Sequence, residues 1–415
     1  MADVDALRGR LTKILWGIRV ALCVTGSAAA YRSIDLARLL IRHGADVVPV
    51  MTPAAARLVG PQLMWWATGN RPILGLTGEM EHVKLGGDGP GSANVVLVAP
   101  ATATTISRIA RGDASNAVTA LVNVAMGAGK PVVIAPAMHE QMYRNPAVSR
   151  AMEELRAMGI RIVPPSMEEG KAKIAPDEEI VEAVISSLRR RTLEGRRFLV
   201  TAGPTLERLD PVRVITNRGS GKTGAYLARE LLARGAEVAI VSGPTEVSMP
   251  RGARVVRVES TEEMVRAVEG LADEMRPDMA IATASPADFR PESAFDRKIP
   301  TEEGALEVRL IPTPKVVDAL APKARVFAFR AVYGLRGDEE LAAEGMDYLR
   351  RHPGVVAVAV NDVSEEGLGF GSEYNRLVLV SRGRVEPLPP LHKRALAVHI
   401  VDFIEALMDA GPRGK

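Results

Sequence analysis

A glycine-rich segment at positions 216–224, Thr-Asn-Arg-Gly-Ser-Gly-Lys-Thr-Gly, contains residues that could bind a phosphate group. It ends like a Walker A loop, but Thr216 stands where that motif requires glycine. Its three glycines also satisfy Gly-x-Gly-x-x-Gly, yet the strand predicted at 198–201 ends too early for a dinucleotide-binding turn. An amphipathic helix is predicted over 223–234, so N–H groups at its start and Lys222 could hold an anion. A purely structural turn is the alternative.

Hydroxyl side chains follow three predicted strands in the first half of the chain. Ser27 lies in a turn of small residues, Thr52 ends the next strand, and Thr102 and Thr105 lie in a hydroxyl-rich turn after a third strand. Any one of these hydroxyls could simply cap a helix. Three such positions at successive strand ends favour a cofactor that carries phosphate.

His82, in the sequence Glu-His-Val-Lys-Leu, is a candidate for proton transfer. Histidine titrates near neutral pH and can therefore accept or deliver a proton during a reaction. Considered without its neighbours, His82 would more often be an ordinary surface residue.

Apolar runs that alternate with helical periods predict two similar α/β halves. We expect two doubly wound, Rossmann-like parallel-sheet domains, residues 1–190 and 191–415, with ligands at the carboxyl ends of their strands. The predicted strands lie at 19–26, 43–50, 95–99 and 132–135 in the first half and at 197–203, 235–241, 279–282 and 355–360 in the second, with helices at 31–42, 177–191 and 223–234.

The composition excludes several classes of protein. With 415 residues, 47% apolar and 25% charged, the chain is typical of a globular protein with two or three domains. Lys and Arg exceed Asp and Glu by 53 − 50 = 3, and no dense basic run occurs, so we expect no nucleic-acid partner. The single cysteine, Cys23, excludes an internal disulfide or a multi-thiolate metal site, and its apolar strand predicts a buried thiol. No signal peptide or membrane span is visible, so a cytoplasmic protein without a membrane partner is expected.

The glycine-rich segment and its surroundings resemble the opening of phosphopantothenate–cysteine ligase. The resemblance rests on Val-Thr-Ala-Gly-Pro-Thr at 200–205, Leu-Asp-Pro-Val-Arg at 209–213, Ile-Thr-Asn-Arg at 215–218 and Gly-Lys-Thr-Gly at 221–224. The strand-end hydroxyls and the Glu-His-Val-Lys-Leu motif of the first half resemble the flavin mononucleotide (FMN) site of cysteine-decarboxylase flavoproteins. Nearly the whole chain thus resembles the bifunctional phosphopantothenoylcysteine decarboxylase/phosphopantothenate–cysteine ligase family of coenzyme A biosynthesis, in its archaeal-like branch.

For the first half, the resemblance implies a flavodoxin-like flavoprotein that uses FMN to decarboxylate phosphopantothenoylcysteine to 4′-phosphopantetheine. His82 matches the family's catalytic histidine, in a His-x-x-Leu motif. His139 replaces the asparagine expected to bind the substrate carboxylate, and Met142 belongs to the same block. The residues that would bind FMN are Gly26, Ser27, Thr52, Thr102, Thr105, Ala137 and Met138.

The family's mobile substrate flap usually carries a proton-donating cysteine, but the corresponding region at 168–175 has none. Cys23 lies in a strand under the flavin loop and cannot replace it. Either Lys171, Lys173 or water donates the proton, or the half reaction ends differently. The sequence leaves these alternatives open.

For the second half, the resemblance implies a ligase that activates 4′-phosphopantothenate with CTP and Mg²⁺ as an acyl-cytidylate, to which cysteine is joined. Asn217 matches the asparagine that holds this intermediate. Lys298 begins the family's Lys-x-Lys-Lys motif, whose later lysines are replaced by Pro300 and Thr301. No metal-ligand cluster is visible in the sequence. The residues that would bind CTP are Gly203, Ser220, Gly221, Lys222, Ala284, Asp288, Lys298 and Phe329.

The resemblance also implies a homo-oligomer built from decarboxylase trimers and ligase dimers. Two alternatives to the bifunctional enzyme stay open. The first is an active ligase fused to a flavoprotein half of altered chemistry, suggested by the missing flap cysteine. The second is a nucleotide-binding regulatory or scaffold protein with both sites silent, which the presence of His82, Asn217, Asp288 and Lys298 disfavours.

Overall fold

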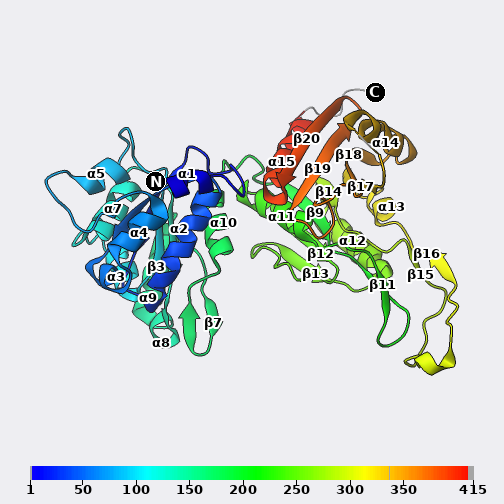
Figure 1. Ribbon diagram of the computed structural model, residues 1–415, viewed down its shortest axis with the longest axis horizontal. Helices are drawn as coiled ribbons and strands as arrows, with labels where there is room; N and C mark the ends of the chain where they lie inside the picture. The colour runs from blue at the N-terminus through cyan, green and yellow to red at the C-terminus, as the bar shows by residue number, and fades with distance from the viewer. Residues whose placement is uncertain (1, 336, 410–415) are drawn as a thin grey trace. The chain divides into compact units, whose positions relative to one another are not determined.

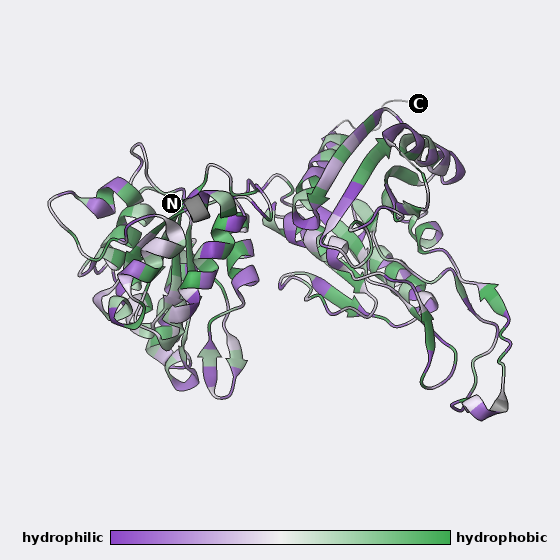
Figure 2. Cartoon of the chain, in the orientation of Figure 1, coloured by the Kyte–Doolittle hydropathy of each residue, from purple (hydrophilic) through white to green (hydrophobic). Residues whose placement is uncertain are grey.

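The computed structural model describes residues 2–335 and 337–409, and the chain divides between Arg189 and Arg190 into two compact units (Figure 1). The predicted domain boundary lies beside this division. Each unit has its own sheet and its own buried apolar core. Figure 2 shows the hydrophobic residues concentrated in the strands and on the inner faces of the helices.

The first unit is built on a five-stranded sheet in the order β2-β1-β3-β4-β6, in which every pair is parallel. The strands are runs of Val, Ile, Leu and Ala that are buried on both faces, as expected when helices cover a parallel sheet. This order is that of the flavodoxin-like doubly wound fold. The strands are β1 (Arg19–Val24), β2 (Asp46–Met51), β3 (Val95–Ala101), β4 (Val132–Pro136) and β6 (Arg161–Ile162).

Helices cover both faces of this sheet. One core cluster joins the sheet to α1–α4 and α10, and a second joins it to α5, α6, α7 and α9. The helix predicted at 31–42 begins as a 3-10 turn, and the one predicted at 177–191 ends at Ser187. The elements are α1 (Ala2–Leu7), η1 (Ala28–Arg32), α2 (Ser33–Arg42), α3 (Pro53–Leu58), α4 (Pro61–Thr68), α5 (Glu81–Gly86), α6 (Ala103–Ala110), α7 (Ala117–Gly127), α8 (Glu140–Tyr143), α9 (Pro146–Ala157) and α10 (Asp177–Ser187).

A small three-stranded sheet in the order β5-β8-β7 contains the segment predicted to be a substrate flap. Strands β7 (Ser166–Glu168) and β8 (Lys171–Lys173) form an antiparallel hairpin, and β5 (Met138–His139) pairs with β8. The turn of the hairpin places Glu169 and Gly170 at φ values of 51° and 67°, the left-handed pair typical of two-residue hairpin turns. The sequence did not predict this hairpin.

The second unit contains an eight-stranded sheet in the order β13-β12-β9-β14-β17-β18-β19-β20. The first six strands are parallel; of these, β9, β12, β14 and β18 were predicted, whereas β13 and β17 were not. Strands β19 and β20 are antiparallel and were not predicted either. The strands are β9 (Arg197–Ala202), β12 (Glu237–Ser242), β13 (Arg254–Arg257), β14 (Met279–Ala282), β17 (Val326–Val332), β18 (Val355–Asp362), β19 (Tyr374–Ser381) and β20 (Arg384–His392).

In this second sheet, α11 (Lys222–Ala233) and α15 (Lys393–Asp409) pack on one face, while α12 (Thr261–Met275), α13 (Val316–Leu320) and α14 (Asp338–Arg351) pack on the other. Two antiparallel hairpins extend from the unit: β10 (Leu206–Arg208) with β11 (Val214–Thr216), and β15 (Phe289–Pro291) with β16 (Leu310–Pro312). A short 3-10 helix, η2 (Thr301–Glu303), lies between β15 and β16. The α/β class with parallel sheets, predicted from the sequence, is confirmed. No helix in the described part of the chain is both long and apolar enough to cross a membrane.

Candidate active sites

The carboxyl ends of β1, β2, β3 and β4 bring the predicted FMN-binding residues of the first unit to one edge of the sheet. Strand order reverses between β1 and β3, where flavodoxin-like folds bind their ligands. Thr25, which the sequence analysis did not single out, connects the loop after β1 with the loop after β3 at this point. Its Oγ1 donates to the Pro100 carbonyl oxygen at 2.7 Å and accepts from the Thr102 N–H at 3.0 Å.

Gly26 lies where the loop after β1 approaches the start of α3. A Cβ at this position would be 2.5 Å from the Cβ of Ala54, closer than such atoms come in proteins. A side chain here would therefore push the two loops apart.

Three hydroxyls of the predicted phosphate site take part in local hydrogen bonds. Thr52 caps α3 by accepting from the Ala55 N–H at 3.2 Å, and Thr102 caps α6 by accepting from the Thr105 N–H at 3.3 Å. The Thr102 and Thr105 hydroxyls are also 3.1 Å apart. Because a hydroxyl both donates and accepts, the cap on α3 leaves the Thr52 proton free to be donated to a ligand.

The Ser27 hydroxyl both donates and accepts a hydrogen bond within the protein. Its hydroxyl donates to the Ala137 carbonyl oxygen at 3.2 Å and accepts from the Ala29 N–H at 3.3 Å. It thus ties the loop after β1 to the loop after β4, where Ala137 precedes Met138 of β5.

His82 lies in the first turn of α5, which packs against α7. Its Nδ1 is buried and has no hydrogen-bond partner among the described residues. A buried, unpaired ring nitrogen is costly unless a bound molecule pairs with it. This position therefore has the chemistry of a ligand-contacting histidine.

The flap hairpin places His139 beside one of its two candidate lysines. His139 and Lys171 are directly paired between β5 and β8, so their side chains emerge as cross-strand neighbours. Lys173 instead forms ion pairs with Glu168 at 3.1 Å and Glu169 at 2.9 Å. Its hydrogen bonds to Glu169 and Glu168 raise the pKa of Lys173, which makes it a weaker acid.

Met142 and Cys23 of the first unit differ in their exposure. Met142, on α8, has 47% of its surface exposed, so it is available to a ligand. Cys23 is fully buried in β1, and burial raises the pKa of its thiol. A buried, protonated thiol fits the packing role predicted for Cys23.

The second unit has a cleft of about 420 Å³ at the carboxyl ends of β9, β14 and β17. The glycine-rich turn and the start of α11 form one wall. Gly221 is the N-cap of α11 at φ 76°, and no side chain caps the helix there. The N–H groups of the first helical turn and the positive end of the helix dipole are therefore available to an anion.

Two glycines of this turn allow very close packing. A Cβ on Gly219 would be 1.8 Å from Ser285 Oγ, and a Cβ on Gly224 would be 2.7 Å from both Ala202 Cβ and Thr283 Oγ1. Gly224 therefore lets α11 lie directly on β9 and β14. This is the packing role of the last glycine in phosphate-binding turns, although the turn follows the β10–β11 hairpin and not the strand itself.

Seven of the eight residues predicted to bind CTP line this cleft, as does Asn217. The Asn217 amide donates to the Pro286 carbonyl oxygen at 2.7 Å, which fixes its orientation and leaves its own oxygen as an acceptor. Asp288 forms an ion pair with Lys315, a cleft residue that the sequence analysis did not single out. The seven residues are Gly203, Ser220, Gly221, Lys222, Ala284, Asp288 and Phe329.

Lys298 does not line the cleft of this chain. It is exposed in the segment between β15 and β16. The next residue, Ile299, is fixed against the β10–β11 turn, because its carbonyl oxygen accepts from Arg213 at 3.0 Å and its N–H contacts Asp210 at 3.5 Å. Burial acts to raise the pKa of Asp210, but hydrogen bonds from backbone N–H groups outweigh it and hold that pKa below its usual value. The carboxylate therefore stays charged and anchors the segment that carries Lys298.

The comparisons with known proteins agree for both units. A family model described as "Flavoprotein" matches residues 10–189, and one described as "DNA/pantothenate metabolism flavoprotein C-terminal domain" matches residues 193–408. The coenzyme A biosynthesis bifunctional protein CoaBC of Thermococcus kodakarensis is 42% identical over 398 residues, 95% of this chain and 96% of its own length. Its namesake from Vibrio cholerae serotype O1 is 33% identical over 408 residues, 95% and 99% of the two chains. The chain belongs to the bifunctional coenzyme A biosynthesis family.

One solved structure is also similar to this chain. The crystal structure of the C-terminal domain of CoaBC is 30% identical, with a TM-score of 0.43, and covers 53% of this chain and 99% of that one. The predicted CoaBC-type function, a decarboxylase half joined to a ligase half in coenzyme A biosynthesis, is confirmed, and the first half is a flavoprotein domain.

Several cleft residues of this CoaBC family member were not predicted as site residues. Lys393 is only 4% exposed, and burial, together with nearby Lys222, lowers its pKa to about 8, although Glu373 acts against this shift. No pattern marks a lone lysine at the start of the last helix. The other unpredicted cleft residues include Thr313, Lys315, Tyr348 and His352.

Proposed function

We propose that the first half binds FMN at the carboxyl ends of β1–β4, and that the second half binds CTP in the cleft beside α11. The second half joins 4′-phosphopantothenate to cysteine through an acyl-cytidylate, and the first half decarboxylates the product to 4′-phosphopantetheine. The observation that carries the proposal for the second half is the uncapped start of α11, which opens into a cleft lined by seven of the eight predicted nucleotide residues. Family membership supports both activities.

The residues of the first half fit a flavin phosphate. The loops after β1, β2 and β3 carry hydroxyls beside helix starts, and Gly26 keeps two of these loops in close contact. Gly26, Ser27, Thr52, Thr102 and Thr105 would hold the phosphate end, and Ala137 and Met138 would lie along the adjoining loop. When bound, FMN would supply the redox chemistry, taking two electrons from the substrate and later returning them.

The protein's own part in decarboxylation is orientation and proton transfer. His82 would accept or deliver a proton through its buried, unpaired Nδ1. His139 and Met142 would contact the substrate, with His139 donating a hydrogen bond to the substrate carboxylate. Lys171, next to His139 across the flap pairing, is the better placed lysine to deliver the final proton, because Lys173 is held by two glutamates.

In the second half, the negative charge of the triphosphate would be stabilised by protein groups that are already in place. The N–H groups at the start of α11 and the Lys222 ammonium would bind the triphosphate as it loses pyrophosphate. Asn217 would hold the acyl phosphate through its oriented, neutral amide. Pyrophosphate leaves when the acyl-cytidylate forms, and the amine of cysteine then displaces cytidine monophosphate.

Lys298 stays in the proposal as a catalytic lysine, although it does not line this cleft. Its role requires that the segment between β15 and β16 bring it to a cleft during the reaction. Lys315, which already contacts Asp288 in the cleft, is the alternative cation.

No group of three or more His, Cys, Asp or Glu side chains within residues 2–335 and 337–409 could hold a metal ion. We therefore propose that Mg²⁺ arrives with CTP and is bound mainly by phosphate oxygens and water. The proposal also includes a cytoplasmic location, 4′-phosphopantothenate, cysteine and CTP as partners, and a homo-oligomer of decarboxylase trimers and ligase dimers.

A second candidate function keeps the ligase and gives the flavoprotein half an altered chemistry. It is favoured by the flap, whose hairpin contains lysines but no cysteine in the region where the family's thiol donor is expected. A lysine is a much weaker acid than a thiol, so the final proton transfer would be slower or would come from water.

The deciding experiment supplies the purified protein with 4′-phosphopantothenate, cysteine, Mg²⁺ and each nucleoside triphosphate in turn, and follows product masses. Formation of 4′-phosphopantetheine with CTP supports both halves. Accumulation of phosphopantothenoylcysteine supports the second candidate. Absence of any product with every nucleotide would refute the ligase proposal.

A further inference from the structure

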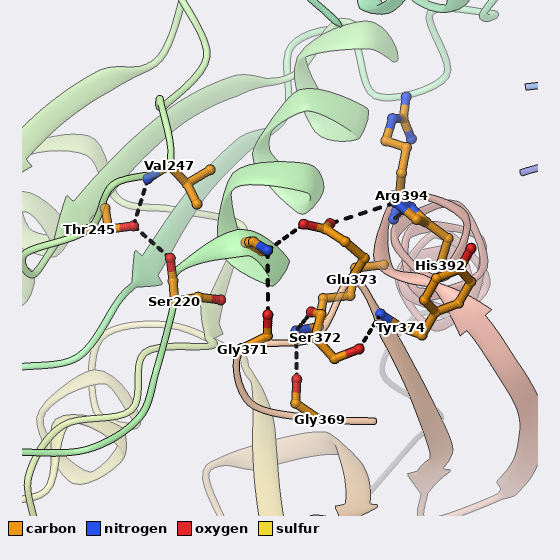
Figure 3. Close-up of polar contacts among 12 residues, drawn as sticks. Ser220, Thr245, Val247, Gly369, Gly371, Ser372, Glu373, Tyr374, His392 and Arg394 are labelled. Atoms are coloured by element: carbon orange, nitrogen blue, oxygen red, sulfur yellow. Dashed lines mark hydrogen bonds and ion pairs between the residues drawn. The ribbon is translucent and has the colours of Figure 1, made fainter. Parts of the chain in front are cut away.

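The loop between β18 and β19 places an acidic residue, Glu373, against the start of α11. The Glu373 carboxylate forms an ion pair with Lys222, the first residue of α11, and the Lys222 ammonium also lies 3.5 Å from the Gly371 carbonyl oxygen. Figure 3 shows Gly369, Gly371, Ser372 and Glu373 of this loop. The two paired side chains are 24% and 44% exposed, so water and salt screen the pair only in part. The positive charge of Lys222 is thus already neutralised by a carboxylate of the protein.

A second lysine anchors the same loop without using the Glu373 carboxylate. The buried Lys393 ammonium donates to the carbonyl oxygens of Gly369 at 2.7 Å and Ser372 at 2.6 Å, and the Lys393 N–H donates to the Glu373 carbonyl oxygen at 2.8 Å. Glycines at positive φ give the loop the turns that direct these carbonyls inward, namely Gly367, Gly369 and Gly371. The loop therefore stays anchored when the Lys222–Glu373 ion pair opens.

The other charged groups near Glu373 do not replace Lys222 as its partner. His392 Nε2 is 3.6 Å from the Glu373 carboxylate, but burial lowers the pKa of His392, so the ring is mainly neutral near pH 7. Arg394 is paired with the buried Glu230 at 2.8 Å. Lys222 is therefore the principal countercharge of the Glu373 carboxylate.

We propose that Glu373 sets the affinity of the ligase cleft for anionic ligands by competing with them for Lys222. The inference rests on the proposed function, in which a triphosphate lies at the start of α11. A phosphate group there and the Glu373 carboxylate are two anions that share one ammonium. Binding must either break the ion pair or bring the two anions together, and both weaken binding. The same competition favours release of pyrophosphate after the acyl-cytidylate has formed.

The test is the binding of CTP with Mg²⁺, and separately of pyrophosphate with Mg²⁺, to the full-length protein by titration calorimetry. Replacing the carboxylate by its neutral isostere, Glu373→Gln, should tighten binding of both probes by about two- to fivefold, the range expected for releasing one partly exposed ion pair. Glu366→Gln removes the same charge from an exposed position of the same loop and should change binding by less than about twofold.

A second pair of variants tests the route through Lys222. Lys222→Met should weaken binding, and the gain from Glu373→Gln should shrink to less than about twofold in that background. An equal gain in both backgrounds, or unchanged or weaker binding by Glu373→Gln alone, would overturn the inference. If the wild-type protein binds no nucleotide or pyrophosphate, the proposed function itself fails. Circular dichroism melting confirms that each variant is folded.

Discussion

The close packing of Gly224 against the sheet leads to a quantitative prediction. A methyl group at this position would be 2.7 Å from both Ala202 Cβ and Thr283 Oγ1, where ordinary contact begins at 3.4 Å. Neither neighbour can move easily, because Ala202 belongs to β9 and the Thr283 hydroxyl donates to the Thr201 carbonyl oxygen at 2.6 Å. Gly224→Ala must therefore lift α11 away from the strands.

The expected cost combines two opposing effects. Alanine in place of glycine within a helix stabilises by about 1 kcal/mol. Overpacking against rigid neighbours costs about 1–3 kcal/mol, and here two contacts are violated at once, so we take the upper end. The net loss is about 2 kcal/mol, or about 4–8 °C in the melting temperature of a unit of this size. Because α11 carries the anion-binding N–H groups, CTP binding should weaken as well.

Gly270 provides a matched control in the same unit. It lies on α12, and a Cβ there would meet nothing within 4 Å. Gly270→Ala should therefore stabilise the second unit by about 0.5–1 kcal/mol through helix propensity alone.

The assay can separate the two units. The three tryptophans, Trp16, Trp65 and Trp66, all belong to the first unit, so tryptophan fluorescence follows that unit, while far-UV circular dichroism follows both. Only the circular dichroism transition assigned to the second unit should shift in the two variants. If Gly224→Ala is as stable as the wild type, or if it gains stability like Gly270→Ala, the packing argument is refuted.

Three other predictions concern ionisable groups. His82→Asn should slow decarboxylation by about 10²-fold or more while leaving product formation by the ligase unchanged, as measured by separate assays of the two half reactions. Lys171→Gln should slow decarboxylation more than Lys173→Gln, because ion pairs with two glutamates raise the pKa of Lys173; equal effects in single-turnover assays would contradict this. Burial lowers the pKa of Lys393 to about 8 from an unfolded value of 10.5, so the unfolded state binds more protons between these values and stability should rise with pH there. Urea unfolding at pH 7.5 and 10 should show an increase of up to about 3 kcal/mol in the wild type that Lys393→Met lacks.

The sequence predicts most of the parallel strands of both sheets, although not β17, for a physical reason. Strands such as β1, β3 and β14 are buried on both faces, so they appear as continuous apolar runs bounded by turns. The edge strand β20 reads Arg-Val-Glu-Pro-Leu-Pro-Pro-Leu-His. Its prolines and charged residues interrupt the apolar run, so the sequence pattern does not predict a strand there.

The same holds for the sites: residues next to a predicted strand could be identified from the sequence, and residues that reach a site from distant segments could not. Residues at strand ends, such as Thr52 and Thr102, could be found because parallel strands place their carboxyl ends at one edge. Lys315 and Lys393 line the cleft from the starts of α13 and α15, far in sequence from the glycine-rich turn, and no local sequence pattern predicts them. The segment that carries Lys298 leaves the sheet altogether, so strand order does not determine where that lysine lies.

The prolines of β20 also limit how copies of this chain can pair at the edge of the large sheet. Pro387, Pro389 and Pro390 lie on the outermost strand of the eight-stranded sheet, and proline has no backbone N–H to donate. An incoming strand would find too few donors there to continue the hydrogen-bonded ladder, which is how many proteins prevent edge-to-edge aggregation. The opposite edge, β13, spans only Arg254–Arg257. Neither edge of this eight-stranded sheet therefore offers a long run of backbone donors, so copies of the second half cannot readily extend it into a continuous sheet.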